Sequence, residues 1–171
     1  GHSTRDLAAF SRVLQAHEIC LLEDIRAFPM SRRHPHFNRA HLELWLPEIG
    51  CDYVWEKDLG GRRSKQMPVD QSPNIALRNP SFRNYADYML SEKFQQAIER
   101  LVGHAKNRNT AIMCAEQLFF RCHRMLVSDY LLAHGHTVLH ILDEKPPKPH
   151  VLTKEARVID GRLVYRGDYL L

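Results

Sequence analysis

The sequence lacks any long apolar run, and no stretch approaches the roughly 20 residues that a membrane-spanning helix requires. Its start, GHSTRDLAAF, has no basic segment followed by an apolar core, so no secretory signal is visible. Internal repeats and low-complexity segments are also missing, and the ordinary charged fraction of 26% argues against global disorder. We therefore expect a cytoplasmic protein that has no membrane partner.

Cysteine is scarce, with four in 171 residues. This number does not make the disulfide framework of a small secreted domain, so we expect free thiols in a reducing compartment. Cys20 opens an apolar run and is expected to pack in the core. The chain also lacks a P-loop, a G-x-G-x-x-G motif and a Ser-His-Asp order. Any site must therefore be built from other residues.

The composition that is present, 44% hydrophobic and 26% charged, fits one globular domain with a sizeable core. We predict a single domain over 1–171, with a long loop or lid over 61–79 and a C-terminal extension over 143–171. The net charge is +4, and many arginines lie in or beside apparent loops, where a guanidinium group suits phosphate or carboxylate ligands. For any single arginine, a solvated surface role is the simpler interpretation.

Helical and strand patterns alternate along the chain. Helices are expected from Thr4 onward with Thr4 or Ser3 as N-cap, over 39–46, over 81–106 with a break near 90–91, and after Glu116 as far as His134. Strands are expected over 19–24, from Asp52, over 110–114 and over 137–142.

The Asp160-Gly161 pair predicts a type I′ turn in a hairpin near the end of the chain. Apolar strands separated by helices indicate an α/β fold. We predict a single three-layer domain with a mostly parallel sheet, Rossmann-like or flavodoxin-like, and a C-terminal hairpin.

Polar residues gather where the predicted strands end. Because ligands bind at the carboxyl ends of parallel strands, three junctions are expected to converge on one edge of the sheet. These junctions carry His2, Ser3 and Arg5 before the first helix, Asp24 and Arg26 after one strand, and Cys114 and Glu116 after another. The convergence predicts a site assembled from separate segments.

Three segments would suit an anion. GHST offers backbone amides and hydroxyl groups ahead of a helix, while SRR and GGRR add charge and glycines that let the backbone approach closely. The further contacts expected are Ser31, Arg32, Arg33, Gly60, Gly61, Arg62, His123 and Arg124. The ligand would be a nucleotide, a sugar phosphate or a nucleic acid. The alternative is that Arg26 and Arg33 pair internally with Asp24 and Glu116 and only hold loops in place.

The stretch CAEQLFFRCHR holds the catalytic candidates Cys114, Glu116 and Cys122. A helix N-terminus with nearby arginines would lower the pKa of a thiol at Cys122, which suits a nucleophile or a redox thiol. Glu116 would act as acid/base or orient an arginine. An equal alternative is that both cysteines are small buried hydrophobes.

Two other ligand types receive less support from the pattern. The spacing C-x7-C-H matches no common zinc motif, and the adjacent Cys122 and His123 would diverge on a helix, so no metal is expected. Tyr85 could stack on a base, although its helical spacing favours core packing.

Six motifs occur in order along the chain: GHSTR, DIRAFPMSRRHPHFN, LGGRR, NYADYM, CAEQLFFRCHR and HIL. In this order they resemble the domain-of-unknown-function 488 family, from Gly1 to His140 and on into HVLT at 150–153. Many members have a proline between the glutamate and CHR, where this chain has residues 118–120, and an aliphatic strand before GHSTR. The family supplies no settled reaction, so the resemblance supports the fold and the special residues more than a function.

We therefore hypothesise an enzyme that acts on a phosphate-bearing substrate, a nucleotide or a nucleic acid, through a Cys/Glu/Arg site at the strand ends. The alternative is a non-catalytic nucleotide- or nucleic-acid-binding module, which the basic balance and the 61–79 loop favour. A scaffolding role comes third. The residues define neither a cofactor nor an oligomeric state.

Overall fold

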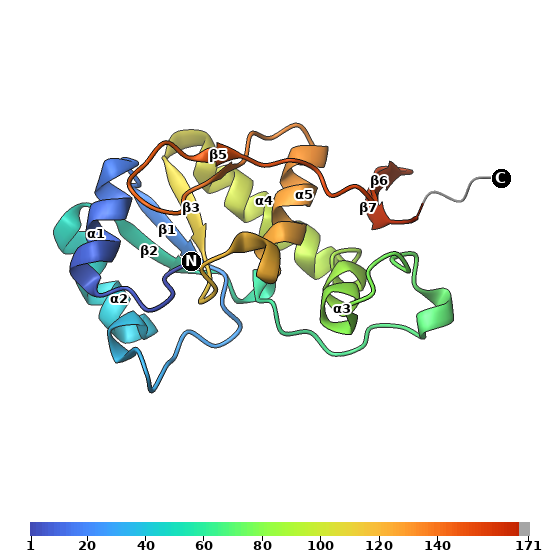
Figure 1. Cartoon of the computed structure of the whole chain (residues 1–171), viewed down its shortest axis with the longest axis horizontal. Coiled ribbons are helices and arrows are strands. Elements are labelled where there is room, and N and C mark those ends of the chain that lie inside the picture. The colour runs from blue at the N-terminus through green and yellow to red at the C-terminus, as the bar shows by residue number, and fades with distance from the viewer. Residues whose placement is uncertain (168–171) are drawn as a thin grey trace.

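The computed structural model, which describes residues 1–167, is built around a parallel sheet of order β2-β1-β3 (Figure 1). The strands are β1 (Leu21–Asp24), β2 (Asp52–Trp55) and β3 (Thr110–Met113). Leu21 of the central strand lies opposite Asp52 on one side and Thr110 on the other. All four residues of β1 are buried, which explains why its apolar start is continuous rather than alternating.

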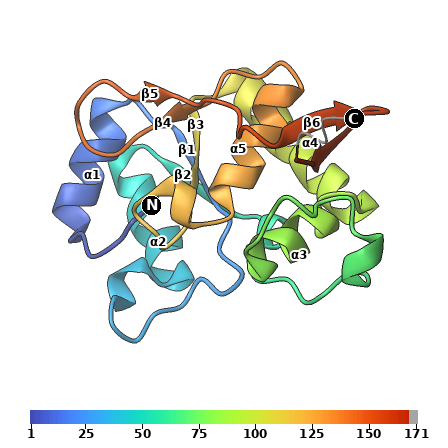
Figure 2. The same cartoon turned by 45° about the vertical axis from the view of Figure 1, so that its right-hand side comes forward.

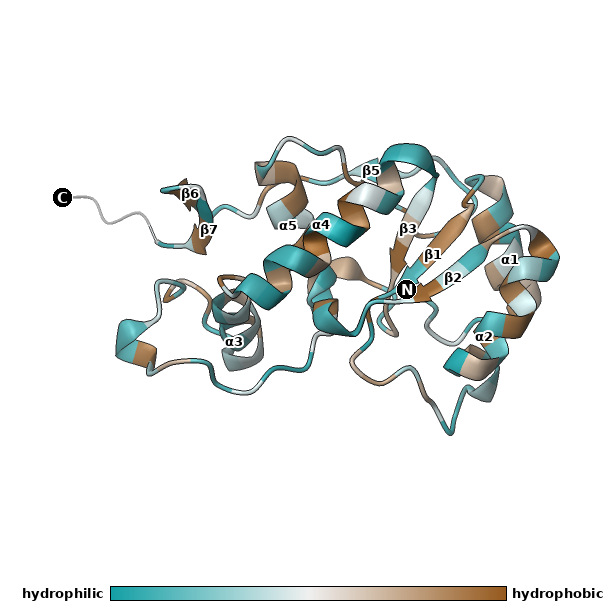
Figure 3. Ribbon diagram, turned by 180° about the vertical axis from the view of Figure 1, so that it is seen from behind, coloured by the Kyte–Doolittle hydropathy of each residue, from teal (hydrophilic) through white to brown (hydrophobic). Residues whose placement is uncertain are grey.

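Helices cover both faces of the sheet, as Figures 1 and 2 show. On one face lie α1 (Leu7–Ala16) and α2 (Arg39–Trp45), whose Phe10, Leu14 and Leu42 belong to a core with Leu22. On the other face lie α4 (Glu92–Asn107) and α5 (Arg124–Ala133), which pack around Ile25. Figure 3 shows hydrophobic residues concentrated on β1 between these layers. The predicted three-layer α/β arrangement is confirmed.

The break that we predicted in the long helical region is confirmed. The first part is α3 (Pro80–Tyr88), and the Ser91 side chain then caps α4 by accepting a hydrogen bond from the Phe94 amide. The preceding loop, 61–79, contains only the short 3₁₀ helix Val69–Gln71 as regular structure.

The start of the first helix was predicted wrongly. Helix α1 begins at Leu7 with Asp6 as its N-cap, and Asp6 Oδ1 accepts from the Ala9 amide at 2.7 Å. Ser3 and Thr4 do not cap it, because the chain here runs beside the end of β3. The amides of His2 and Ser3 donate to the carbonyls of Cys114 and Ala115, each at 3.0 Å.

The helix expected after Glu116 starts later, at Arg124. A 3₁₀ turn, Phe119–Arg121, comes first, and Cys122 then has an extended backbone. Residues 115–121 therefore connect β3 to α5 as a loop that contains one 3₁₀ turn. Cys20, which we expected in the core, is exposed.

The strand expected over 137–142 does not join the parallel sheet. Only β4 (Leu139–His140) is regular, and it pairs antiparallel with β5 (Lys148–Pro149). The prolines at 146 and 147 lie between the two strands, where their fixed φ favours a change of chain direction. The final hairpin of β6 (Ala156–Ile159) and β7 (Arg162–Tyr165) is as predicted, because Asp160 and Gly161 both have positive φ, as a type I′ turn requires.

The C-terminal extension is attached to α5 by a buried carboxylate that the sequence reasoning missed. Asp129 Oδ1 lies 2.9 Å from His150 Nε2 and accepts from the Thr153 amide at 2.8 Å, while Oδ2 accepts from the Tyr165 hydroxyl at 2.9 Å. His150 Nδ1 in turn lies 2.8 Å from His140 Nε2. Burial, with the nearby His150, lowers the pKa of His140 to about 4. No helix within residues 1–167 has both the length and the apolar character to cross a membrane.

Candidate functional site

A pocket of about 460 Å³ lies at the carboxyl edge of the sheet, and we call it the strand-end pocket. It brings together His2, Ser3, Arg26 and Glu116, which come from the three predicted junctions, with Ser31 and Arg33 of the predicted anion-binding segment SRR. His34 and Arg121 also line it. Sequence reasoning did not select these two as site residues, although each lies within a motif that it quoted. The order β2-β1-β3 explains the position: the chain adds β2 on one side of β1 and β3 on the other, and connections that leave on opposite sides open a crevice at the end of β1.

Asp24 and Arg26 form a buried ion pair on the inner side of this pocket. Arg26 Nε lies 2.9 Å and 3.0 Å from the two carboxylate oxygens of Asp24, and Nη2 lies 2.6 Å from Oδ2. The Asp24 side chain is fully buried and that of Arg26 is 6% exposed. Tyr53 adds a hydroxyl donor to Asp24 Oδ2 at 2.7 Å, and Arg26 Nη2 also donates to the Phe37 carbonyl at 2.7 Å. The internal pairing considered for Arg26 is therefore present.

His2 is buried and neutral beside this pair. Burial, together with the positive charge of Arg26, lowers the pKa of His2 to about 4. A neutral imidazole has one donor and one acceptor. The contacts fit Nδ1 donating to the Ser3 carbonyl at 2.9 Å and Nε2 accepting from Arg26 Nη1 at 3.3 Å. The ring stacks on Phe37 at 4.2 Å, so His2 holds Arg26 in place.

The outer part of the pocket carries charges without partners in the chain. Within residues 1–167, the side chains of Arg33, Glu116 and Arg121 make no hydrogen bond or ion pair, and all three are exposed. The alternative pairing of Arg33 with Glu116 is thus not formed in this structure. Arg32 is exposed as well, but it does not line the pocket. Two guanidinium groups and one carboxylate are therefore available to a ligand.

The two thiols lie behind the wall of the pocket rather than in it. Cys114 and Cys122 are buried, and their sulfur atoms are 3.2 Å apart. Arg124 donates from Nε to the sulfur of Cys122 at 3.2 Å, and from Nη2 to the carbonyls of Glu116 and Gln117. Arg124 thus supports the 115–121 loop from inside. Arg5 has a similar supporting role, because it donates to the carbonyls of Gly1 and Leu142.

The GGRR segment and NYADYM meet His123 elsewhere, not in the strand-end pocket. His123 Nε2 lies 2.9 Å from the Ile25 carbonyl, and its ring packs on Tyr85 at 5.1 Å. Tyr85 is fully buried and donates to the Leu59 carbonyl, so its ring is not open to a base from solvent. Arg62 does not line the strand-end pocket, but its guanidinium group lies over the ring of Phe28, which does. Gly60 packs on the backbone of Ala27, where a Cβ atom would lie 2.8 Å from Cα. This cluster joins the sheet to α3.

Gly61 is expected to be essential to that cluster. A Cβ atom at this position would lie 2.2 Å from Nδ1 of His123, whose ring is held by its contacts with Ile25 and Tyr85. Gly61→Ala should therefore lower the free energy of unfolding by about 1–3 kcal/mol, as overpacking does in other cores. Urea unfolding followed by circular dichroism measures this change.

The matched control is Gly103→Ala in α4. A Cβ atom there would meet nothing within 4 Å. Because glycine is unfavourable inside a helix, this variant should be more stable than the parent by about 0.5–1 kcal/mol. Equal stability of the Gly61→Ala variant and the parent would contradict the close packing of His123.

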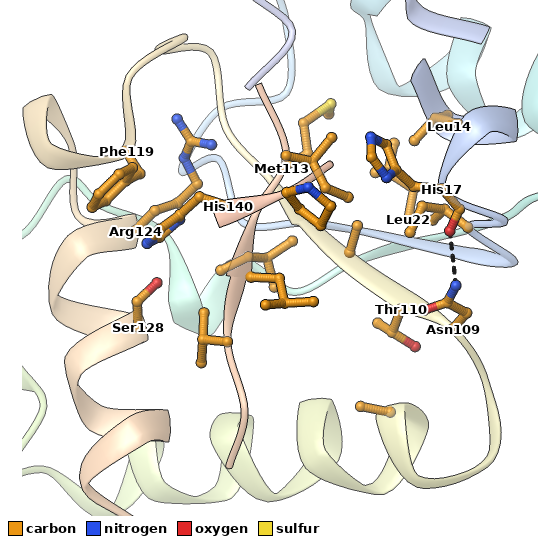
Figure 4. A pocket seen from close by; sticks show the side chains of 18 of the residues that line it. Leu14, His17, Leu22, Asn109, Thr110, Met113, Phe119, Arg124, Ser128 and His140 are labelled. Atoms are coloured by element: carbon orange, nitrogen blue, oxygen red, sulfur yellow. Dashed lines mark hydrogen bonds between the residues drawn. The ribbon is translucent and has the colours of Figure 1, made fainter. Parts of the chain in front are cut away.

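A second cavity, of about 570 Å³, lies beside β3, which is an edge strand of the parallel sheet (Figure 4). It separates β3 and α1 from the 136–142 segment and is lined largely by apolar side chains such as Leu14, Leu22 and Met113. At one end Asn109 Nδ2 donates to the His17 carbonyl at 2.8 Å. Its apolar lining contrasts with the charged groups of the strand-end pocket.

No group of three or more histidine, cysteine, aspartate or glutamate residues within 1–167 is arranged to hold a metal ion. What the fold and the site define is an α/β domain with a basic pocket at the carboxyl edge of a parallel sheet. A family model described as "Domain of unknown function DUF488" matches residues 6–131. The chain belongs to this family, as its motifs predicted. No curated protein and no solved structure matches the chain.

Proposed function

We propose that the protein binds a phosphate-bearing ligand, a nucleotide or a nucleic acid, in the strand-end pocket and acts on it as an enzyme. The observation that carries this proposal is the pair of unpaired guanidinium groups, Arg33 and Arg121, facing one pocket. Guanidinium groups match phosphate oxygens in a bidentate fork, and the exposed position spares them a desolvation cost before the ligand arrives.

Arg26 would contribute from the inner side. A guanidinium group has five N–H donors, and the contacts with Asp24, Phe37 and His2 use four of them. One N–H of Nη1 has no acceptor among the described residues and is available to a phosphate oxygen. The hydroxyl groups of Ser3 and Ser31 line the same pocket and are suited to the remaining oxygens.

Glu116 would supply the chemistry. Its carboxylate lines the pocket beside the two arginines and has no partner in the described chain. In this role it accepts a proton from a water molecule that attacks phosphorus, while Arg33 and Arg121 stabilise the charge on the phosphoryl oxygens. Cys114 and Cys122 take no part in this step, because they lie outside the pocket lining.

A binding module without chemistry is the second candidate. The position of Cys114 and Cys122 outside the pocket lining favours this candidate, because neither of the thiol nucleophiles that the sequence suggested reaches the pocket. The two candidates share the ligand and differ only in turnover.

Binding is tested with pyrophosphate and with labelled single- and double-stranded oligonucleotides, titrated at several salt concentrations. We expect Arg33→Gln and Arg121→Gln each to weaken binding about tenfold, since a hydrogen bond to a charged group contributes about 1.5–3 kcal/mol. If the ligand is a nucleic acid, each change should also reduce the salt slope by about 1.

The control variant is Arg108→Gln. Arg108 comes just before β3, at the opposite edge of the sheet, so the variant loses the same charge without altering the pocket. Its affinity should stay within about twofold of the parent, because exposed charges more than a Debye length apart are largely screened. Equal weakening by all three changes, or no binding of any probe at low salt, would contradict the proposal.

Turnover separates the two candidates. The purified protein is incubated with nucleoside triphosphates and with short DNA and RNA strands, and release of phosphate or of shorter strands is measured. If the protein is an enzyme, we expect turnover in the parent, and we expect Glu116→Gln to abolish this turnover while ligand binding persists. Ligand binding without turnover supports the binding module, and turnover that survives Glu116→Gln excludes Glu116 as the base.

A further inference from the structure

The thiols of Cys114 and Cys122 form a close pair from two different elements. Cys114 directly follows β3, and Cys122 lies two residues before α5. Their sulfur atoms are 3.2 Å apart, and the two residues are only 3% and 8% exposed. A disulfide bond is about 2.05 Å long, so a small side-chain adjustment would bring the sulfur atoms to bonding distance.

The surroundings of the pair favour one thiolate and one thiol. The sulfur of Cys122 accepts from Arg124 Nε at 3.2 Å and from the Arg124 amide, in the first turn of α5, at 3.4 Å. The hydrogen bond from Cys114, supported by His123 and Arg124, lowers the pKa of Cys122. The same hydrogen bond, together with burial, raises the pKa of Cys114. The contacts of Arg124 with the Cys122 sulfur favour Cys122 as the thiolate, and Cys114 then donates the proton between the two sulfur atoms.

This arrangement suits oxidation better than metal binding. A cation held by both sulfur atoms would lie next to the Arg124 guanidinium group, which already contacts Cys122. The described residues also offer no third histidine, cysteine or carboxylate ligand at this place. An anionic sulfur beside a guanidinium group is instead the environment of a reactive thiol.

We propose that Cys114 and Cys122 are a redox-modification site, at which a peroxide converts the two thiols into a reversible disulfide. In the first step the Cys122 thiolate attacks a peroxide oxygen. An S–O bond forms, the O–O bond breaks, and hydroxide leaves, so Cys122 becomes a sulfenic acid. In the second step the Cys114 sulfur attacks the Cys122 sulfur. The S–S bond forms, the S–O bond breaks, and the leaving hydroxide takes the Cys114 proton as water.

The disulfide would close residues 115–121 into a covalent loop. Ala115, Glu116, Gln117, Leu118 and Arg121 of this loop line the strand-end pocket. Oxidation also removes the anionic sulfur that Arg124 contacts, while Arg124 remains bonded to the carbonyls of Glu116 and Gln117. A change in the oxidation state of the two thiols therefore alters the segment of the pocket wall that carries Glu116. The inference does not depend on the proposed function, because it concerns only the state of the thiols.

The experiment uses the whole chain with Cys20→Ser, which removes the exposed thiol. Folded protein is treated with hydrogen peroxide, the remaining thiols are alkylated, and the products are identified by peptide mass spectrometry before and after dithiothreitol. We expect a Cys114–Cys122 disulfide that forms at least about tenfold faster than any oxidation of Cys51, because thiolates are the reactive species. Cys51 is the internal control, since burial raises its pKa to about 11.

Two variants separate the steps. In Cys122→Ser, Cys114 should stay reduced at a dose of peroxide that oxidises the parent completely. In Cys114→Ser, Cys122 should oxidise to sulfenic acid and beyond, because no second thiol resolves it. The disulfide measured in the Cys20→Ser protein tests the proposal even if one of these two variants fails to fold. Three results would each overturn the proposal. The first is that the thiols react only after the protein is unfolded in urea, the second is that Cys114 oxidises before Cys122, and the third is a disulfide that involves Cys51.

Discussion

Replacement of Asp129 by alanine is expected to lower the free energy of unfolding by about 3–5 kcal/mol, because three groups lose their acceptor and each buried unsatisfied group costs about 1–3 kcal/mol. The Asp129 side chain is fully buried. Three groups depend on it: the imidazole of His150, the amide of Thr153 and the hydroxyl of Tyr165. In the variant these donors stay buried without an acceptor, and each unsatisfied group carries a desolvation penalty.

The loss of stability in the Asp129→Ala variant should extend beyond α5. Both β7, through Tyr165, and the segment that follows β5, through His150, are attached at this carboxylate. Hydrogen exchange should therefore show faster exchange of the β6–β7 hairpin amides in the variant than in the parent, because its attachment to α5 is lost.

Two control variants provide a comparison for the size of the stability change at Asp129. Tyr165→Phe removes one of the three hydrogen bonds and should cost about 1 kcal/mol. Asp70 is an exposed residue of the 61–79 loop, and Asp70→Ala should leave the free energy of unfolding within about 0.5 kcal/mol of the parent. A change at Asp129 no larger than that at Asp70 would show that the carboxylate does not hold the extension.

Arg26→Met is expected to have an effect of the same size, about 3–5 kcal/mol, because it leaves the fully buried Asp24 carboxylate without its counter-charge. Methionine keeps much of the length of the side chain, so the loss comes mainly from the removed charge and hydrogen bonds. Asp24 keeps the hydroxyl of Tyr53 and the backbone amide of residue 26 as donors, but two neutral donors do not replace a bidentate guanidinium group.

A double-mutant cycle tests the pairing itself. The variant Asp24→Asn with Arg26→Met should be less destabilised than the sum of the two single changes, since residues in one network are coupled. Arg39→Met is the comparison, because Arg39 pairs with Glu43 on the exposed face of α2, and its loss should be much smaller. Additive effects at Asp24 and Arg26 would contradict a coupled ion pair.

Much of the fold could be predicted because local patterns and tertiary packing agree. The apolar start of β1 gave its position, the Ser91 cap separates α3 from α4, and the Asp160-Gly161 pair matches the hairpin turn. The predictions failed where distant segments compete with local signals. Ser3 and Thr4 are suitable caps by residue type, but the adjacent backbone pairs with the end of β3 and the helix starts later.

The site could be predicted only in part. Of the residues predicted at the strand ends, His2, Ser3, Arg26 and Glu116 line one pocket, because parallel strands bring their carboxyl ends together. Gly60, Gly61 and His123, which were expected to contact the same ligand, instead pack against one another or against neighbouring backbone. Tyr85 lies in the core, as its helical spacing favoured. Residue type does not distinguish a glycine that admits a ligand from one that admits a histidine ring.

The sequence by itself determined the three-layer α/β class, the family and the set of polar residues at the strand ends, since these follow from periodicity and motif order. Only the tertiary structure decided how those residues divide. It turned Arg26 inward to Asp24, left Arg33 and Arg121 facing solvent, and placed the two thiols against each other behind the wall. The physical reason is that a guanidinium or thiol group is defined by its partners, and these partners come from segments far apart in the chain.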